Sequence, residues 1–165
     1  MLRTISRVKS KNRPPLPDTA EALFLNEHYS KTKEMQQFLF ANEIFQGLRL
    51  LIFASDFFLS LLFEASVICC DGTFKTVPSI FVQLYTINFF YQGKLMPAVY
   101  VLCKTKKAML YQRVFALLHA EAARRNRSFS PKTIITDFES AVMLSLQIDF
   151  PESEHRGCFF HFCQV

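Results

Sequence analysis

Two aspartates, Asp71 and Asp137, each lie at the end of a short apolar run that is typical of a buried strand. The runs are residues 67–70 and residues 133–136. Carboxylates at the exits of neighbouring central strands repel each other unless a cation lies between them. Mg²⁺ and Mn²⁺ prefer such oxygen ligands. The pair therefore requires a fold that brings two strand ends together, and it indicates metal-dependent phosphoryl transfer.

Each aspartate also has a purely structural interpretation. Asp71-Gly72 is a common β-turn dipeptide, which would place it at a hairpin tip without any chemistry. Asp137 precedes an expected helix and could serve as its N-cap. The nearby Glu139 is a spare carboxylate, which we expect to point into solvent from the first turn of that helix, where the helix dipole favours it.

The order of the expected elements indicates an α/β fold. A strand, a cap and a short buried helix are expected first, over residues 48–54, 55–56 and 57–65. Next come three strands, a helix, a strand, a helix and a last strand, over 67–70, 80–90, 95–103, 106–125, 132–136, 140–148 and 156–160. This order predicts a mixed sheet, with three antiparallel strands followed by parallel strands and with helices on both faces.

The charge distribution divides the chain into three parts. Five of its 19 Lys and Arg residues precede the first acid, Asp18, so 14 basic residues balance the 14 acids of the rest. Residues 1–18 are therefore expected to be a basic, disordered tail, with a phosphate-binding arm or nuclear-import signal as the functional alternative. A helical lead-in is expected over 19–46 and the main domain over 47–165. The protein is expected to be nuclear or otherwise intracellular.

A second basic stretch lies in the expected helix and its flanks. Between residues 104 and 132, eight Lys and Arg residues accompany the single acid Glu121. The stretch could face DNA phosphates, or it could be an ordinary solvated helix face. The candidate DNA contacts are Lys104, Lys106, Lys107, Arg124, Arg125 and Arg127.

Near the end of the chain, Cys158 and His161 form a Cys-x-x-His motif. Together with His155 and Cys163 they suggest zinc, but their spacing matches none of the common paired-ligand patterns, so zinc is not expected. The neighbouring phenylalanines are expected in the core rather than stacked on bases. Five cysteines without a secretory signal indicate a reducing compartment.

No membrane segment is expected. The apolar stretch over residues 44–63 is interrupted by Arg49 and Asp56. The uncharged runs that remain are far shorter than the ~20 residues that a bilayer requires.

These motifs together closely resemble the Mutator-like element (MULE) transposase domain. The resemblance covers roughly Gly47 to Val165, including residues 50–55, the stretch from Asp71 to Tyr85, the Asp137 run and the Cys-x-x-His motif. It implies an RNase H-like fold in which three acidic residues carry metal-dependent DNA cleavage and strand transfer. Asp71 and Asp137 match the first two of these residues and would share Mg²⁺ or Mn²⁺.

In the MULE family the third acid is a glutamate beyond the Cys-x-x-His motif, whereas this sequence stops at Val165. We therefore expect a domain that is incomplete at its C-terminus, binds metal weakly and has little or no nuclease activity. The intact form would bind transposon ends and could form a homo-oligomer. The alternatives are a domesticated or truncated non-catalytic module that binds DNA or protein, and a different RNase H-like nuclease that takes a third carboxylate from Asp149 or Glu152.

Overall fold

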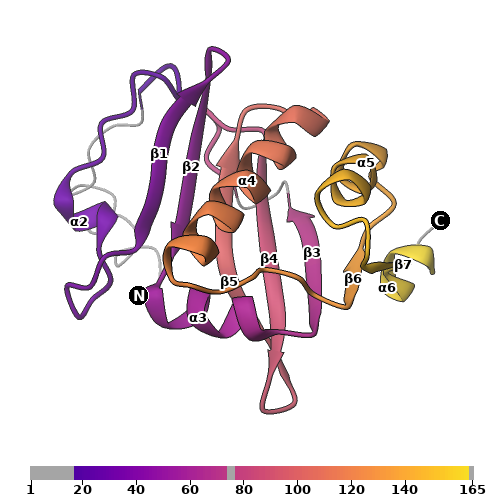
Figure 1. The fold of residues 1–165 in the computed structure, drawn as a ribbon. Coiled ribbons are helices and arrows are strands. Elements are labelled where there is room, and N and C mark those ends of the chain that lie inside the picture. The colour runs from indigo at the N-terminus through magenta and orange to yellow at the C-terminus, as the bar shows by residue number, and fades with distance from the viewer. Residues whose placement is uncertain (1–16, 74–76, 164–165) are drawn as a thin grey trace, which may run out of the picture.

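The computed structural model describes residues 17–73 and 77–163, and its centre is a seven-stranded sheet in the order β1-β2-β5-β4-β3-β6-β7 (Figure 1). The strands are β1 (Leu39–Phe45), β2 (Leu48–Ala54), β3 (Val67–Thr73), β4 (Gln83–Tyr91), β5 (Lys94–Cys103), β6 (Thr133–Thr136) and β7 (Glu154–Gly157). The helices are α2 (Glu27–Ser30), α3 (Asp56–Glu64), α4 (Ala108–Arg124), α5 (Ser140–Asp149) and α6 (Phe159–Phe162). The predicted α/β class is confirmed.

The strand directions agree with the predicted mixed sheet. β3, β4 and β5 pair antiparallel, and β6 and β7 are added in parallel to β3 and to each other. The β1–β2 hairpin extends the sheet beyond β5. Most of the predicted tail, residues 1–16, lies outside the described residues.

The prediction of helices on both faces is wrong for the described residues. α3, α4 and α5 all contribute to one core cluster, which includes Leu62, Val114 and Leu146. The opposite face carries a smaller cluster around Leu51 and Phe81, to which irregular segments contribute. The crossovers through α4 and α5 advance in the same direction along the sheet, and because both are right-handed they place their helices on the same face.

The predicted helical lead-in over residues 19–46 is also wrong. It contains the four-residue helix α2 and then β1, which pairs antiparallel with β2. The hairpin turn is Gln46-Gly47, whose φ angles are 49° and 78°. Positive φ at both central residues is the signature of the type I′ turn, whose twist fits a two-residue hairpin. The same dipeptide joins β4 and β5 at residues 92–93, where the sequence did predict the turn.

The start of α3 was predicted well and the end of the chain was not. Ser55 caps α3 by accepting a hydrogen bond from the backbone N–H of Phe58 at 3.3 Å. The last strand was expected over residues 156–160, but β7 ends at Gly157 and the next residues form α6. The backbone N–H of Cys158 donates to the Thr136 carbonyl at 2.7 Å. Beyond this bond the chain leaves the sheet and forms α6.

The apolar stretch over residues 44–63 is divided between β1, β2 and α3. Among the described residues, no helix is both long enough and apolar enough to span a membrane.

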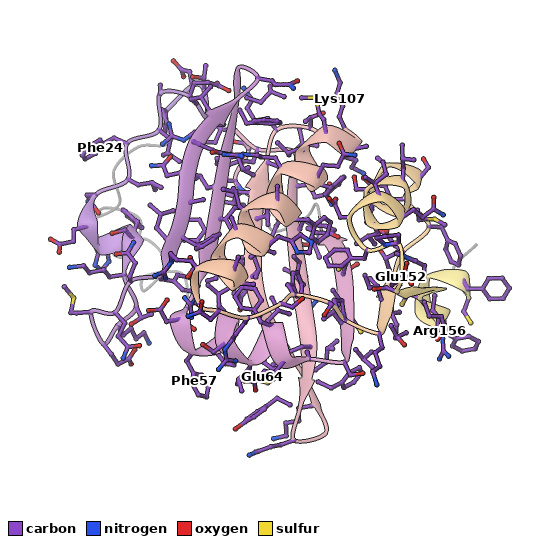
Figure 2. All side chains as sticks on the ribbon, viewed as in Figure 1. Phe24, Phe57, Glu64, Lys107, Glu152 and Arg156 are labelled. Carbon is purple, nitrogen blue, oxygen red and sulfur yellow. The ribbon has the colours of Figure 1, made fainter. Side chains whose placement is uncertain are left out.

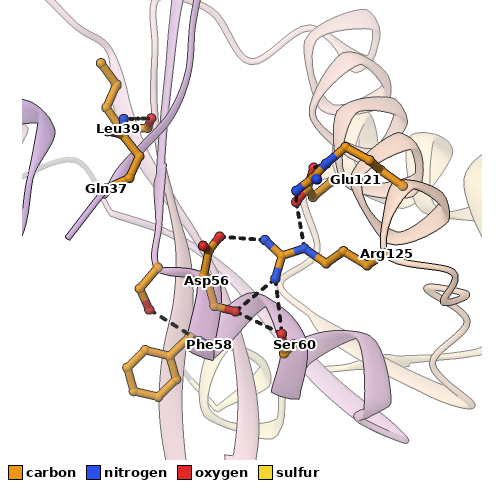
Figure 3. Close-up of polar contacts among 9 residues, drawn as sticks. Gln37, Leu39, Asp56, Phe58, Ser60, Glu121 and Arg125 are labelled. Atoms are coloured by element: carbon orange, nitrogen blue, oxygen red, sulfur yellow. Dashed lines mark hydrogen bonds and ion pairs between the residues drawn. The ribbon is translucent and has the colours of Figure 1, made fainter.

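The C-terminal end of α4 is fastened to α3 by arginine. Arg125 donates to Glu121 on its own helix at 2.6 Å and to Asp56 and Ser60 on α3 at 2.6 and 3.1 Å (Figure 3). Arg124 also bonds Glu121, and the two guanidinium groups lower the pKa of Glu121 to about 2. Arg125 therefore holds the two helices together, while Arg124 helps to fix Glu121 within α4.

We predict that Gly47→Ala lowers the free energy of unfolding by about 1 kcal/mol, because a β-carbon is strained at φ 78°. Apart from the adjoining residues, no atom of the described chain lies within 4 Å of the added carbon, so the cost comes from the backbone alone. Gly47→Asn should cost less, since asparagine tolerates the left-handed region. Urea unfolding measures both variants, and an alanine variant as stable as the original chain would contradict the turn assignment.

Candidate metal and catalytic site

Asp71 and Asp137 lie at matching positions on adjacent parallel strands. Asp71 is inside β3, opposite Thr86 of β4, so the hairpin-tip interpretation is ruled out. Asp137 directly follows β6. β3 and β6 pair Cys70 with Thr136, the residues immediately before the two aspartates. Because neighbouring strands lie ~4.8 Å apart, the two acidic residues lie side by side, Asp71 within β3 and Asp137 just beyond the end of β6.

The carboxylate of Asp137 is oriented by its own loop. Its Oδ1 accepts a hydrogen bond from the backbone N–H of Glu139 at 3.3 Å and lies 3.4 Å from the Thr136 hydroxyl. The N-cap of α5 is Glu139 rather than Asp137. Asp137 is half-buried and forms a local turn of the kind aspartate favours. The loop therefore fixes the direction of this carboxylate without using it as the helix cap.

Polar side chains of β4 hold the backbone on either side of Asp71. Successive side chains alternate along a strand, and the buried Cys70 belongs to the core under the helices, so Asp71 faces the opposite side of the sheet. The Thr86 hydroxyl donates to the Asp71 carbonyl at 3.3 Å, and the Asn88 amide donates to the Cys69 carbonyl at 3.0 Å. Sequence reasoning missed Thr86 and Asn88, because only the strand register identifies them as neighbours.

Glu139 does not point into solvent as expected. Its Oε1 lies 2.7 Å from the Tyr111 hydroxyl, and its Oε2 lies 3.8 Å from Lys106 Nζ. The same Tyr111 hydroxyl lies 3.0 Å from the side-chain amide of the fully buried Gln83. Burial, reinforced by Glu139, raises the pKa of Tyr111 far above its usual range, so the phenol keeps its proton. Glu139 is thus already held by α4.

The aspartate pair fits a hard divalent cation by the chemistry of its donors. Mg²⁺ keeps several waters and is commonly held by one or two carboxylates together with substrate phosphates. Within the described residues, no group of three or more His, Cys, Asp or Glu side chains is placed to hold a metal ion. We therefore expect this pair on its own to hold a cation weakly.

Cys158, the first residue of the Cys-x-x-His motif, lies beside the end of β6. The backbone N–H of Cys158 bonds the carbonyl of Thr136, so Cys158 is next to the residue that precedes Asp137. The side chain of His161 lies outside the described residues. His155 lies 3.0 Å from the Phe150 carbonyl through Nε2, so that nitrogen has a protein partner.

The prediction of core phenylalanines at the end of the chain is wrong for two positions. Phe159 and Phe162 are 78% and 65% exposed. They lie in α6, outside the sheet, whereas the predicted strand would have directed alternate residues into the core.

The structure separates the candidate DNA contacts into two groups at opposite ends of α4. Lys107 and Glu64 mark these two ends of the molecule (Figure 2). The ion pairs of the group near α3 are Arg124–Glu121, Arg125–Asp56 and Arg127–Glu64. Those near the start of α4 are Lys104–Glu21 and Lys106–Glu139, while the exposed Lys107 has no ion pair within the part of the chain that the structure describes. The arginines therefore form ion pairs within α4 and with α3, and they lie away from the two aspartates.

The late carboxylates Asp149 and Glu152 do not join the pair. α5 begins just after Asp137 and Asp149 is its last residue, so the two ends of the helix lie roughly 14 Å apart at 1.5 Å per residue. Asp149 and Glu152 therefore lie at the far end of α5 from Asp137. A nuclease that uses either of them as third ligand is inconsistent with this geometry.

A family model described as the MULE transposase domain matches residues 67–165, which is more than half of the chain. The matched range contains both aspartates and the Cys-x-x-His motif. A search of curated proteins finds no match.

Asp149 is predicted to make the protein less stable as pH rises from 4 to 6. Burial raises the pKa of this carboxyl to about 6, and its Oδ2 is buried without a hydrogen-bond partner among the described residues. Because the folded state binds this proton more tightly than the unfolded chain, the contribution of Asp149 to stability is greatest below pH 4 and is lost as the group ionises.

Asp149→Asn should therefore raise the free energy of unfolding at pH 7.5 by ~1 kcal/mol, after allowance for solvent screening. In the same variant, the free energy of unfolding measured with urea should change less between pH 4 and pH 6. Glu152→Gln, at an exposed turn, is the control and should change neither quantity. An unchanged slope in Asp149→Asn would contradict the prediction.

Gly72→Ala is predicted to cost about 2 kcal/mol of stability through overpacking. A β-carbon at Gly72 would lie 2.1 Å from Gln83 Nε2, and moving that side chain breaks its contact with Tyr111. The Gln83→Ala background removes the clash, so the same glycine substitution should cost much less there. Thermal unfolding of the four chains gives the coupling energy, and equal costs in both backgrounds would refute the steric explanation.

Proposed function

Because the chain belongs to the MULE transposase domain family, we propose that it is a transposase-derived, DNA-processing domain in which Asp71 and Asp137 hold Mg²⁺ or Mn²⁺. DNA, specifically transposon ends, is the proposed substrate, and strand cleavage and transfer the proposed reaction. The observation that carries the proposal is the register of β3 and β6, which pairs Cys70 with Thr136 and so aligns the two acids that follow them. The support is geometric and chemical: two carboxylates on adjacent parallel strands are the ligands that a hard cation prefers.

We also propose that the fold is RNase H-like. The support is the sheet segment β5-β4-β3-β6-β7, with an antiparallel meander first and two strands added in parallel through α4 and α5. The two acids lie on β3 and directly after β6, in the middle of that segment.

Asp71 and Asp137 would hold the divalent cations, which would supply Lewis-acid activation of the attacking water or 3′ hydroxyl and charge stabilisation at the leaving oxygen. The residues of this chain supply charge and orientation. Asp137 is aimed by its bond from Glu139 N–H, and the backbone carbonyl of Asp71 is held by Thr86. Among the described residues, no third His, Cys, Asp or Glu side chain joins the two aspartates in a group that could hold a metal ion. The family resemblance gives the third role to a glutamate, so we expect little cleavage from these residues alone.

The test is Mn²⁺ binding to the folded chain, measured by calorimetry. Asp71→Asn and Asp137→Asn should each weaken binding at least tenfold, because each removes one of two charged ligands. The control is Asp56→Asn, which removes an exposed carboxylate from α3 that pairs with Arg125 and should leave affinity unchanged.

Two outcomes would count against the proposal. Equal Mn²⁺ affinity in all four chains would show that the cation binds elsewhere. A folded chain that binds no Mn²⁺ would favour the alternative of a non-catalytic DNA-binding or protein-interaction module.

A further inference from the structure

Behind the two aspartates lies a buried polar network that none of the proposed chemistry uses. Its centre is Tyr111 in the first turn of α4, which is 1% exposed. The hydroxyl lies 2.7 Å from Glu139 Oε1 and 3.0 Å from the side-chain amide of Gln83, which is fully buried. The network therefore links the start of α4 to β4 and to the start of α5.

The hydrogen-bond directions follow from the number of protons. A carboxylate can only accept, and a phenol has a single proton to donate. Tyr111 therefore donates to Glu139, and the amide of Gln83 must donate to the Tyr111 oxygen, with its N–H on the side of the phenol. In the opposite amide orientation, Gln83 Nε2 has no partner among the described residues. In this orientation each of the two bonds, from Gln83 to Tyr111 and from Tyr111 to Glu139, has one donor and one acceptor.

Both ends of this chain of bonds lie next to a candidate metal ligand. The Gln83 side chain fills the space that a β-carbon on Gly72 would need, at 2.1 Å, and Gly72 follows Asp71 directly. At the other end, the backbone N–H of Glu139 donates to Oδ1 of Asp137. The network thus contacts the neighbours of both aspartates through rigid, buried groups.

A second contact keeps α5 fixed against α4. The buried Ser145 of α5 donates its hydroxyl to the carbonyl of Ala108, the first residue of α4, at 2.8 Å. This bond joins the start of α4 to α5, the helix that Glu139 begins as N-cap, and so it limits how far Glu139 can move relative to Tyr111.

We infer that Tyr111 is a positioning residue, which sets the placement of Asp137 relative to Asp71 through its bonds to Glu139 and Gln83. This inference rests on the proposed function for its metal readout. Outer-shell partners of metal ligands are worth about 10- to 100-fold in metal affinity when removed. Tyr111 touches neither aspartate, so its effect must pass through the two residues it bonds.

The test compares Tyr111→Phe with Tyr85→Phe in the full chain. The two rings are both buried, with centroids 4.9 Å apart, and each variant deletes one buried hydroxyl. Tyr111→Phe should weaken Mn²⁺ binding about tenfold, while Tyr85→Phe should stay within about twofold. Glu139→Gln keeps an acceptor for Tyr111 and should retain most of the affinity, whereas Glu139→Ala should resemble Tyr111→Phe. Equal Mn²⁺ affinity in the two tyrosine variants would overturn the inference.

A measurement that needs no metal separates this inference from the proposed function. Amide hydrogen exchange at Glu139 reports the bond to Asp137, and it should be about tenfold faster in Tyr111→Phe than in Tyr85→Phe. If the original chain binds no Mn²⁺, the proposed function fails, and the exchange rates still decide whether Tyr111 holds the loop. Identical exchange at Glu139 in both variants would overturn the inference.

Discussion

The parallel pairing of β3 with β6 is the interaction on which the rest of this structure depends. It joins residues 67–70 to residues 133–136, more than sixty positions away, and it aligns the aspartate that follows each run. The crossover through α4 makes this pairing possible, because it brings β6 past β4 to the outer edge of β3. α4 in turn is secured to the sheet by its apolar face and to α3 by Arg125. The alignment of the two aspartates therefore depends on helix packing that lies some distance from them.

The local sequence predicts elements whose signals lie within a few residues. The apolar runs predicted β2, β3 and β6, and Ser55 predicted the start of α3. β1 was missed because none of its residues is fully buried and they alternate only partly between half-buried and exposed positions, and its best signal is the Gln46-Gly47 turn. The same Gln-Gly dipeptide was predicted as a turn at residues 92–93 because strand-like runs over 80–90 and 95–103 flank it, whereas Gln46-Gly47 follows a segment that was expected to be helical.

The candidate site was predictable as a pair of acids but not in its surroundings. Asp71 and Asp137 follow apolar runs in the sequence, whereas Thr86, Tyr111 and Gln83 become relevant only through strand register and the docking of α4. Charge counting failed in a similar way. The arginines near the end of α4 find acids on α3 that lie more than sixty residues away, so their number does not tell which surface could meet phosphates. Which surface could meet phosphates depends on where the acidic residues lie in the fold.

A buried network of polar groups beside two carboxylates has a physical logic that apolar packing lacks. Replacing Gln83, Tyr111 and Glu139 by hydrocarbon would avoid the cost of desolvating them, and buried polar groups are stabilising only when every partner is present. Hydrocarbon contacts, however, are not directional and allow neighbouring segments to shift slightly. Two like charges on adjacent strands repel, so the loop that carries Asp137 tends to move away from Asp71 unless directional bonds restrain it. The bond from Tyr111 to Glu139 provides that restraint from the core side of the sheet, and the glycine after Asp71 leaves the space that Gln83 needs to complete it.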